Sequence, residues 1–96
     1  MRIDRFLWFA RLAKTRSAAQ AIAEKGTLRL DGRRIERSSA AVRVGSIIVF
    51  PLYGQVRALR VEALPQRRGP PAEAATLYTP LEIGTAKGVD ERTPDA

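Results

Sequence analysis

The 96-residue chain contains no cysteine and no histidine. Disulfide bonds, cysteine-ligated zinc and catalysis by a cysteine or histidine side chain are therefore excluded. Long apolar runs are also lacking: the longest uncharged stretch, 44–56, has 13 residues and contains Pro51 and Gly54, whereas a helix needs about 20 apolar residues to cross a bilayer. The sequence predicts neither a membrane span nor a secretory signal core, and we expect a cytoplasmic protein.

Acidic side chains are scarce in the first two thirds of the chain. Residues 1–68 hold 15 Lys and Arg against 5 Asp and Glu, a balance of +10, whereas residues 69–96 hold 2 against 5, a balance of −3. Thirteen of the 15 cations are arginine, whose planar guanidinium group pairs with phosphate and stacks on bases. Such uncompensated charge favours a polyanionic partner. Nucleic acid is the leading class of partner, and an anionic membrane surface is the second.

Two helices are predicted in the first 26 residues. Asp4 is the expected N-cap of the first helix, because its carboxylate suits a helix start, and residues 6–13 contain no helix breaker. Ile3, Leu7 and Ala10 fall on one face at helical spacing, which predicts the side that faces the core.

The second helix has two candidate starts. Thr15 or Ser17 can cap it, and Ser17 with Gln20 would form a capping box. Gly26 stands where a helix commonly ends on a left-handed residue, directly after Lys25, which suits the negative end of the helix dipole.

A change of period predicts β-structure after the second helix. Residues 27–35 alternate in polarity around Asp31-Gly32, a strong signal for a two-residue hairpin turn, and 42–50 and 56–64 have the pattern of two further strands. A short helix is expected over 72–78. The order helix, helix, strand, strand, strand, helix predicts an α+β chain. We expect a domain over 1–64, a loop and short helix packing back on it over 65–83, and a flexible tail over 84–96.

The connection between the two helices concentrates cations and hydroxyls. Lys14, Thr15, Arg16 and Ser17 stand in a row, with Arg11 less than a turn upstream. A helix start exposes unpaired backbone N–H groups and the positive end of the dipole, so a phosphate chain passing here would meet donors and charges together. The plainer alternative is that a hydroxyl caps the helix and the cations are solvated.

One flank of the first helix carries Arg5, Trp8 and Arg11 at successive three-residue steps, with Arg2 nearby. Trp8 either stacks on an unpaired base or covers the small core, and both interpretations stay open. Arg33 and Arg34 follow the hairpin turn, where they either extend the basic surface or serve solubility. The pair 67–68 in the glycine-proline loop is equally ambiguous.

Motifs for enzyme chemistry are lacking. The sequence shows no glycine-rich phosphate loop, no paired-carboxylate spacing and no cluster of metal ligands, and Asp4 and Asp31 have a cap and a turn as better explanations. We expect a binding protein without catalytic residues, metal or cofactor.

The residues from 2 to 35 resemble the S-four RNA-binding domain. That motif runs Arg-Leu-Asp, a leucine three residues on, a helix start of hydroxyl-Arg-Ser/Ala-x-Ala, Ile-x-x-Gly, and alternating residues into Asn-Gly. In the next predicted strand, Gly45-Ser46 stands where the family usually has Gly-Asp. The residues at these places are Arg2-Ile3-Asp4, Leu7, Thr15-Arg16-Ser17, Ala19, Gly26, Leu28, Leu30 and Asp31-Gly32, with Ile22 four residues before Gly26.

Among carriers of this domain, the chain is similar to the heat-shock protein fifteen family in "FLWFARLAKTR" (6–16) and "RRGPPAEAATLY" (67–78). The resemblance implies two N-terminal helices packed on a small, mainly antiparallel sheet, plus a short C-terminal helix. It also implies binding to ribosomal RNA of the large subunit, in ribosome recycling or rescue of stalled nascent-chain complexes under heat stress, with peptidyl-tRNA as a further candidate partner. We expect a monomer whose RNA-binding residues are Arg2, Arg5, Trp8, Arg11, Lys14, Thr15, Arg16, Ser17, Gln20, Arg33 and Arg34.

Two other binding functions stay open at this point. A DNA-binding helix-turn-helix would need a third helix and base-reading side chains, whereas the second predicted helix is rich in alanine; weak DNA binding is the milder form of this alternative. A peripheral protein whose first helix lies in anionic headgroups is the other.

Overall fold

The structure is a computed structural model that describes residues 1–52 and 54–81. The flexible tail expected over 84–96, and the last two residues of the segment 65–83, lie outside the described residues. No helix in the described part is long and apolar enough to cross a membrane.

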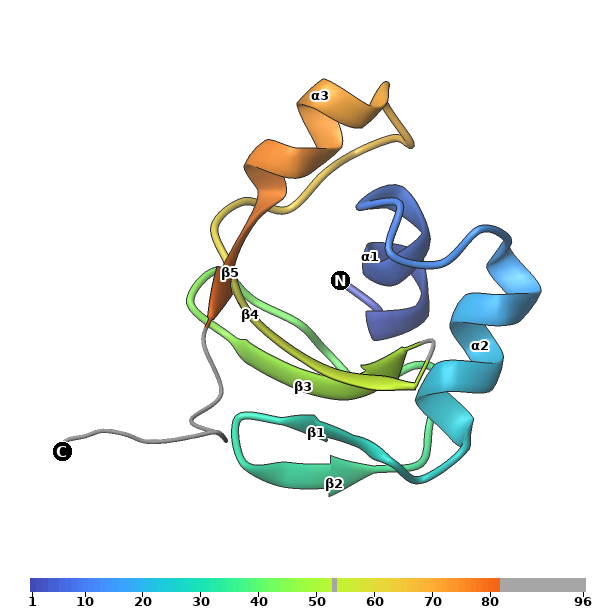
Figure 1. Ribbon diagram of the computed structural model, residues 1–96. Coiled ribbons are helices and arrows are strands. Elements are labelled where there is room, and N and C mark those ends of the chain that lie inside the picture. The colour runs from blue at the N-terminus through green and yellow to red at the C-terminus, as the bar shows by residue number, and fades with distance from the viewer. Residues whose placement is uncertain (53, 82–96) are drawn as a thin grey trace, which may run out of the picture.

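Two helices and an antiparallel sheet share one core, which confirms the α+β class. Helices α1 (Ile3–Phe9) and α2 (Arg16–Glu24) pack on each other beside the sheet (Figure 1). The sheet holds five described strands in the order β2-β1-β3-β4-β5, and all neighbours are antiparallel. These strands are β1 (Leu28–Leu30), β2 (Arg33–Ile35), β3 (Ile47–Leu52), β4 (Gln55–Val61) and β5 (Tyr78–Leu81).

The core lies between the helices and the sheet. The apolar face predicted for the first helix is buried, and α2 contributes the buried Ala19 and Ala23, with Ala18 and Ile22 packed against the core. The segment after β4 returns to the core through α3 (Pro71–Ala74) and the 3-10 turn η1 (Ala75–Leu77). The core residues include Ile3, Phe6, Leu7, Ala19, Ala23, Leu28, Val42, Ile48, Phe50, Leu59, Val61 and Leu77.

The predicted hairpin turn is confirmed. Asp31 and Gly32 both have positive φ, 52° and 84°, as a type I′ turn requires, and Leu30 pairs with Arg33 across it. The Asp31 carboxylate accepts the Ile47 N–H at 2.9 Å, and the Asp31 N–H donates to the Ile47 carbonyl at 2.8 Å. The turn residue therefore also ties the hairpin to β3.

The first helix is shorter than predicted. It ends at Phe9 instead of Ala13, and Arg11 has a φ of 60°. The N–H groups of Leu12 and Ala13 both donate to the Leu7 carbonyl, and both side chains are buried. Burial of these two residues against the core outweighs the local helix propensity.

The structure identifies the N-cap residue of each of the two helices. Arg2, and not Asp4, is the N-cap of α1, and its side chain makes no capping hydrogen bond. Asp4 lies in the first turn, so the capping prediction for it is wrong. Thr15 caps α2 by accepting the Ala18 N–H at 3.0 Å. The alternative start at Ser17, with its capping box, is therefore also wrong.

The strand predictions miss one strand and overextend two, since β4 ends at Val61 and 62–64 are not part of it. Residues 42–46 are not a strand; Val42 is buried and its N–H donates to the Met1 carbonyl. The helix expected over 72–78 ends at Leu77, and Tyr78 opens β5, which pairs with β4. Pro80 argued against a strand here, because proline is tolerated in a sheet mainly on an edge strand. In the structure β5 is such an edge strand. The helix-turn-helix alternative does not match this fold, since α2 leads directly into the sheet and α3 has four residues.

We predict that Val61→Ala destabilises the protein far more than Val56→Ala. Both residues lie on β4, but Val61 is fully buried and Val56 is 59% exposed. Losing two buried methyl groups and leaving a cavity costs about 2 kcal/mol, whereas the exposed site costs about 0.5 kcal/mol. Urea unfolding of the two variants measures the difference, and equal losses would contradict the assignment of the core face of β4.

Candidate nucleic-acid interface

A buried carboxylate lies at the junction of the two helices. Asp4, 0% exposed, accepts two hydrogen bonds from Arg2, Nε to Oδ1 and Nη2 to Oδ2, both 3.0 Å. Its Oδ1 also accepts the Arg5 backbone N–H at 2.7 Å, and Arg16 Nη2 lies 3.6 Å from Oδ2. Because Arg2 precedes α1 and Arg16 is the first residue of α2, one side chain ties both helix starts together. We call Arg2, Asp4 and Arg16 the Asp4 cluster.

The charge of Asp4 is retained in this environment. Burial by itself raises the pKa of the carboxyl group, but the hydrogen bonds from Arg2 and the Arg5 N–H, with the charges of Arg2 and Arg16, outweigh it and lower that pKa. The carboxylate hydrogen bond and charge in turn raise the pKa of Arg2. One negative charge against two positive ones leaves the cluster cationic.

The arginines of the Asp4 cluster keep donors available. Their side chains are 44% and 36% exposed. Arg2 Nη2 also reaches the Ser38 hydroxyl at 3.3 Å. The Nε of Arg16 is buried without a hydrogen-bond partner among the described residues, so its guanidinium group is only partly satisfied within the protein.

The start of α2 places further polar groups beside this cluster. The Thr15 hydroxyl oxygen accepts the capping bond, which leaves its O–H free to donate to an anion. Lys14 and Ser17 are exposed, Gln20 is half-buried, and Arg5 on α1 is exposed. Neither Lys14 nor Arg5 forms an ion pair with a described residue. Of the sequence-predicted residues at this junction, the structure brings Arg2 and Arg16 together on Asp4.

A second group forms at the other end of α1. The guanidinium carbon of Arg68 lies over the Trp8 ring, 5.6 Å from its centroid, and the Nε of Arg68 donates to the Trp8 carbonyl at 3.0 Å. Arg11 Nε donates to the Gly69 carbonyl at 2.8 Å. Trp8 is half-buried and packs against the core. We call Trp8, Arg11 and Arg68 the Trp8 cluster; Arg68 is the member that the sequence left ambiguous.

The hairpin arginines lie elsewhere. The β1–β2 turn lies at the end of the molecule opposite the α1–α2 connection (Figure 1). Arg34 is paired with Glu36 at 3.1 Å, and Arg33 is exposed. Neither Arg33 nor Arg34 forms a hydrogen bond or ion pair with the Asp4 cluster within the described residues.

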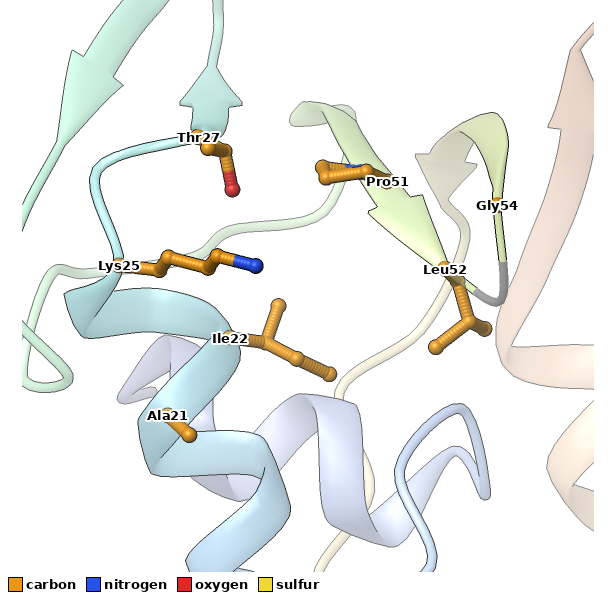
Figure 2. Close-up of a pocket in the computed structure, with 7 residues that line it drawn as sticks. All are labelled: Ala21, Ile22, Lys25, Thr27, Pro51, Leu52 and Gly54. Atoms are coloured by element: carbon orange, nitrogen blue, oxygen red, sulfur yellow. The ribbon is translucent and has the colours of Figure 1, made fainter.

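A shallow cavity of about 290 Å³ opens between the end of α2 and the β3–β4 turn. Figure 2 shows the Lys25 amine reaching across it towards the other wall, with Ile22 and Leu52 below. None of the predicted RNA-binding residues lines this cavity. Within the described residues, no group of three or more acidic side chains could hold a metal ion.

Asp4 and Arg68 each hold one of the two clusters together, and of these two residues only Asp4 could have been identified from the sequence. Asp4 is the only acidic residue before Glu24, amid five Lys and Arg residues, so an ion pair in the fold was foreseeable. The contact of Arg68 with Trp8 joins residues 60 apart in the chain, and no local pattern indicates it.

Comparison with known proteins places this geometry in context. The S4 domain family model matches residues 1–48. Heat shock protein 15 of Escherichia coli strain K12 is 33% identical over 92 residues, which cover 96% of this chain and 65% of that protein. The heat shock protein 15 homolog of Haemophilus influenzae is 36% identical over 88 residues, 91% of this chain and 66% of that protein. The chain thus spans about two thirds of the length of these curated relatives.

A solved structure is similar as well. The trimeric structure of Vibrio cholerae heat shock protein 15 superposes with a TM-score of 0.79 at 31% identity, covering 84% of this chain and 81% of that one. That relative is a trimer, so it gives no support to the monomer expected for this chain. The family match ends at residue 48, inside β3, and the loop that carries Arg68 lies beyond it.

We predict that Asp4→Asn lowers the free energy of unfolding by about 2 kcal/mol at neutral pH, because charge-assisted hydrogen bonds are lost from a buried site. The folded-state pKa of Asp4 is lowered, so its stabilisation is complete above the ordinary pKa of about 4 and is lost as the pH falls through the folded value. The stability gap between wild type and variant should therefore close below about pH 4.

Urea unfolding at pH 7 and at pH 3 measures this gap. Glu24→Gln, which removes an exposed carboxylate on α2, is the matched control and should change stability by less than about 0.5 kcal/mol. A loss for Asp4→Asn that stays the same at both pH values would show that the pairing does not depend on the Asp4 charge.

Proposed function

Since the chain belongs to the S4 domain family and is a relative of heat shock protein 15, we propose that it binds structured RNA through the helix junction. The observation that carries this proposal is the Asp4 cluster, in which one buried carboxylate orients two partly exposed arginines, Arg2 at the start of α1 and Arg16 at the start of α2.

The chemistry of the junction suits a phosphate chain. The first turn of α2 has unpaired N–H groups at the positive end of the helix dipole. Lys14 and Arg16 add charge, and the Thr15 hydroxyl adds a donor. Because Asp4 holds the arginines before any ligand arrives, less side-chain freedom is lost on binding.

This arrangement suits binding to RNA phosphates better than reading base edges in a duplex. The deep groove of an A-form helix is closed to side chains, so proteins contact its phosphates, its 2′-hydroxyls and its unpaired bases. Alanine predominates along α2, and it offers few groups for reading base edges. The proposed recognition therefore depends mainly on phosphate position and shape.

The specific target we propose is ribosomal RNA of the large subunit. Kinship with heat shock protein 15 supports it, as does the resemblance described above. In this proposal the protein acts in the cytoplasm, in recycling or rescue of stalled nascent-chain complexes under heat stress, with peptidyl-tRNA as a further partner. In this proposal Arg33 and Arg34 contact a part of the RNA other than the one held at the helix junction.

We predict that Lys14→Ala weakens binding to purified large ribosomal subunits about three- to tenfold. It should also flatten the plot of log affinity against log salt by about 0.7–0.9, the contribution of one phosphate contact. Lys14 is the cleanest test, because it is exposed and has no ion pair among the described residues. Arg11 bonds to Gly69 and Arg16 pairs with Asp4, so replacing either would change the stability of the fold as well as the affinity for RNA.

Lys25→Ala is the matched control, since Lys25 is exposed at the opposite end of α2, and it should leave both affinity and salt slope unchanged. Co-sedimentation with large and small subunits over a salt series measures both quantities. A Lys14→Ala slope equal to that of wild type would refute the phosphate contact, and equal binding to both subunits would refute the proposed target.

A further inference from the structure

We propose that Arg68, whose guanidinium group is held over the Trp8 ring, contacts RNA directly and forms with its plane the surface on which one unpaired base stacks. The inference rests on the RNA binding proposed above and names what the Trp8 cluster recognises. It adds to the interface a residue that lies outside the S4 match over 1–48.

Two reciprocal hydrogen bonds fix the Trp8 cluster. Arg68 donates from Nε to the Trp8 carbonyl at the end of α1, and Arg11 donates from Nε to the Gly69 carbonyl in the returning loop. Each segment therefore holds an arginine of the other. These bonds use only the Nε atoms, and the Nη groups of both arginines have no hydrogen bond to a described residue.

The loop is also anchored from its other side. Arg67 pairs with Glu73 of α3 at 3.0 Å. The Glu73 carboxylate lies where a side chain at position 69 would be, so glycine permits this close approach. Arg67 is thus directed towards α3, and Arg68, its neighbour, towards Trp8. This division of roles makes Arg67 a natural control.

The geometry favours stacking on the arginine over stacking on the tryptophan. The guanidinium of Arg68 covers the Trp8 ring, and Phe9 lies next to the indole, with 5.4 Å between ring centroids. Arg68 is itself only half-buried. Guanidinium planes stack on unpaired bases in RNA complexes, and a cation held over an aromatic ring is already oriented for this.

The test compares two RNA duplexes of the same sequence, one blunt and one with a single bulged adenosine. Wild type should bind the bulged duplex about tenfold more tightly, the size of effect that stacking of one base produces. That preference should persist as salt rises and both affinities fall, because the two duplexes carry nearly the same phosphates. Trp8 is the only tryptophan, so its fluorescence should respond to the bulged duplex and not to the blunt one.

Arg68→Lys keeps the charge but removes the planar face, and it should reduce the tenfold preference to less than about twofold. Arg67→Lys should keep the full preference. A wild type that binds both duplexes equally would overturn the inference while leaving the proposed RNA binding intact, and this measurement needs no variant. A preference that survives in Arg68→Lys, or is lost equally in Arg67→Lys, would also overturn it. Binding to neither duplex would refute the proposed function itself.

Discussion

The ion pairing of one buried carboxylate sets the geometry on which the rest of the candidate interface depends. Asp4 has no access to solvent, yet its pKa is lowered because Arg2, the Arg5 N–H and Arg16 compensate for its burial. Removing a charge from water is costly unless such partners are present. The same contacts that keep Asp4 ionised also fix the relative position of the two helix starts, so that stability and the arrangement of the basic surface have a common origin.

The sequence predicted the parts of this fold that local chemistry determines. The hairpin turn follows from Asp31-Gly32, the α2 cap from Thr15, and the core face of α1 from its helical spacing. The predictions that were wrong concern residues governed by distant contacts. Asp4 resembles a cap but pairs with Arg16, and Ala13 resembles helix but is drawn into the core. Strand β5 was not predicted, because it forms by pairing with β4 and the local sequence of β5 does not indicate that pairing.

The same difference between local and distant contacts separates the predicted from the unpredicted residues of the candidate interface. The residues at the helix junction lie within the first 20 positions, so charge and spacing indicated them together. Arg68 approaches Trp8 only because β4, the loop and α3 return the chain over the end of α1 (Figure 1). From the sequence, Arg68 could be identified only as a cation, and its contact with Trp8 could not be predicted. Conversely, Arg33 and Arg34 looked equivalent to the other arginines in the sequence, and in the fold they form no hydrogen bond or ion pair with the Asp4 cluster within the described residues.

The two outer strands of the sheet have a consequence for self-association. On β2 the exposed Arg33 and Arg34 line the margin, and on β5 Pro80 supplies no N–H for pairing. Charge and proline are the usual means by which natural sheets discourage edge-to-edge addition of another chain. Copies of this protein crowded on a shared polyanion are therefore not expected to join edge to edge through β2 or β5 of the described sheet.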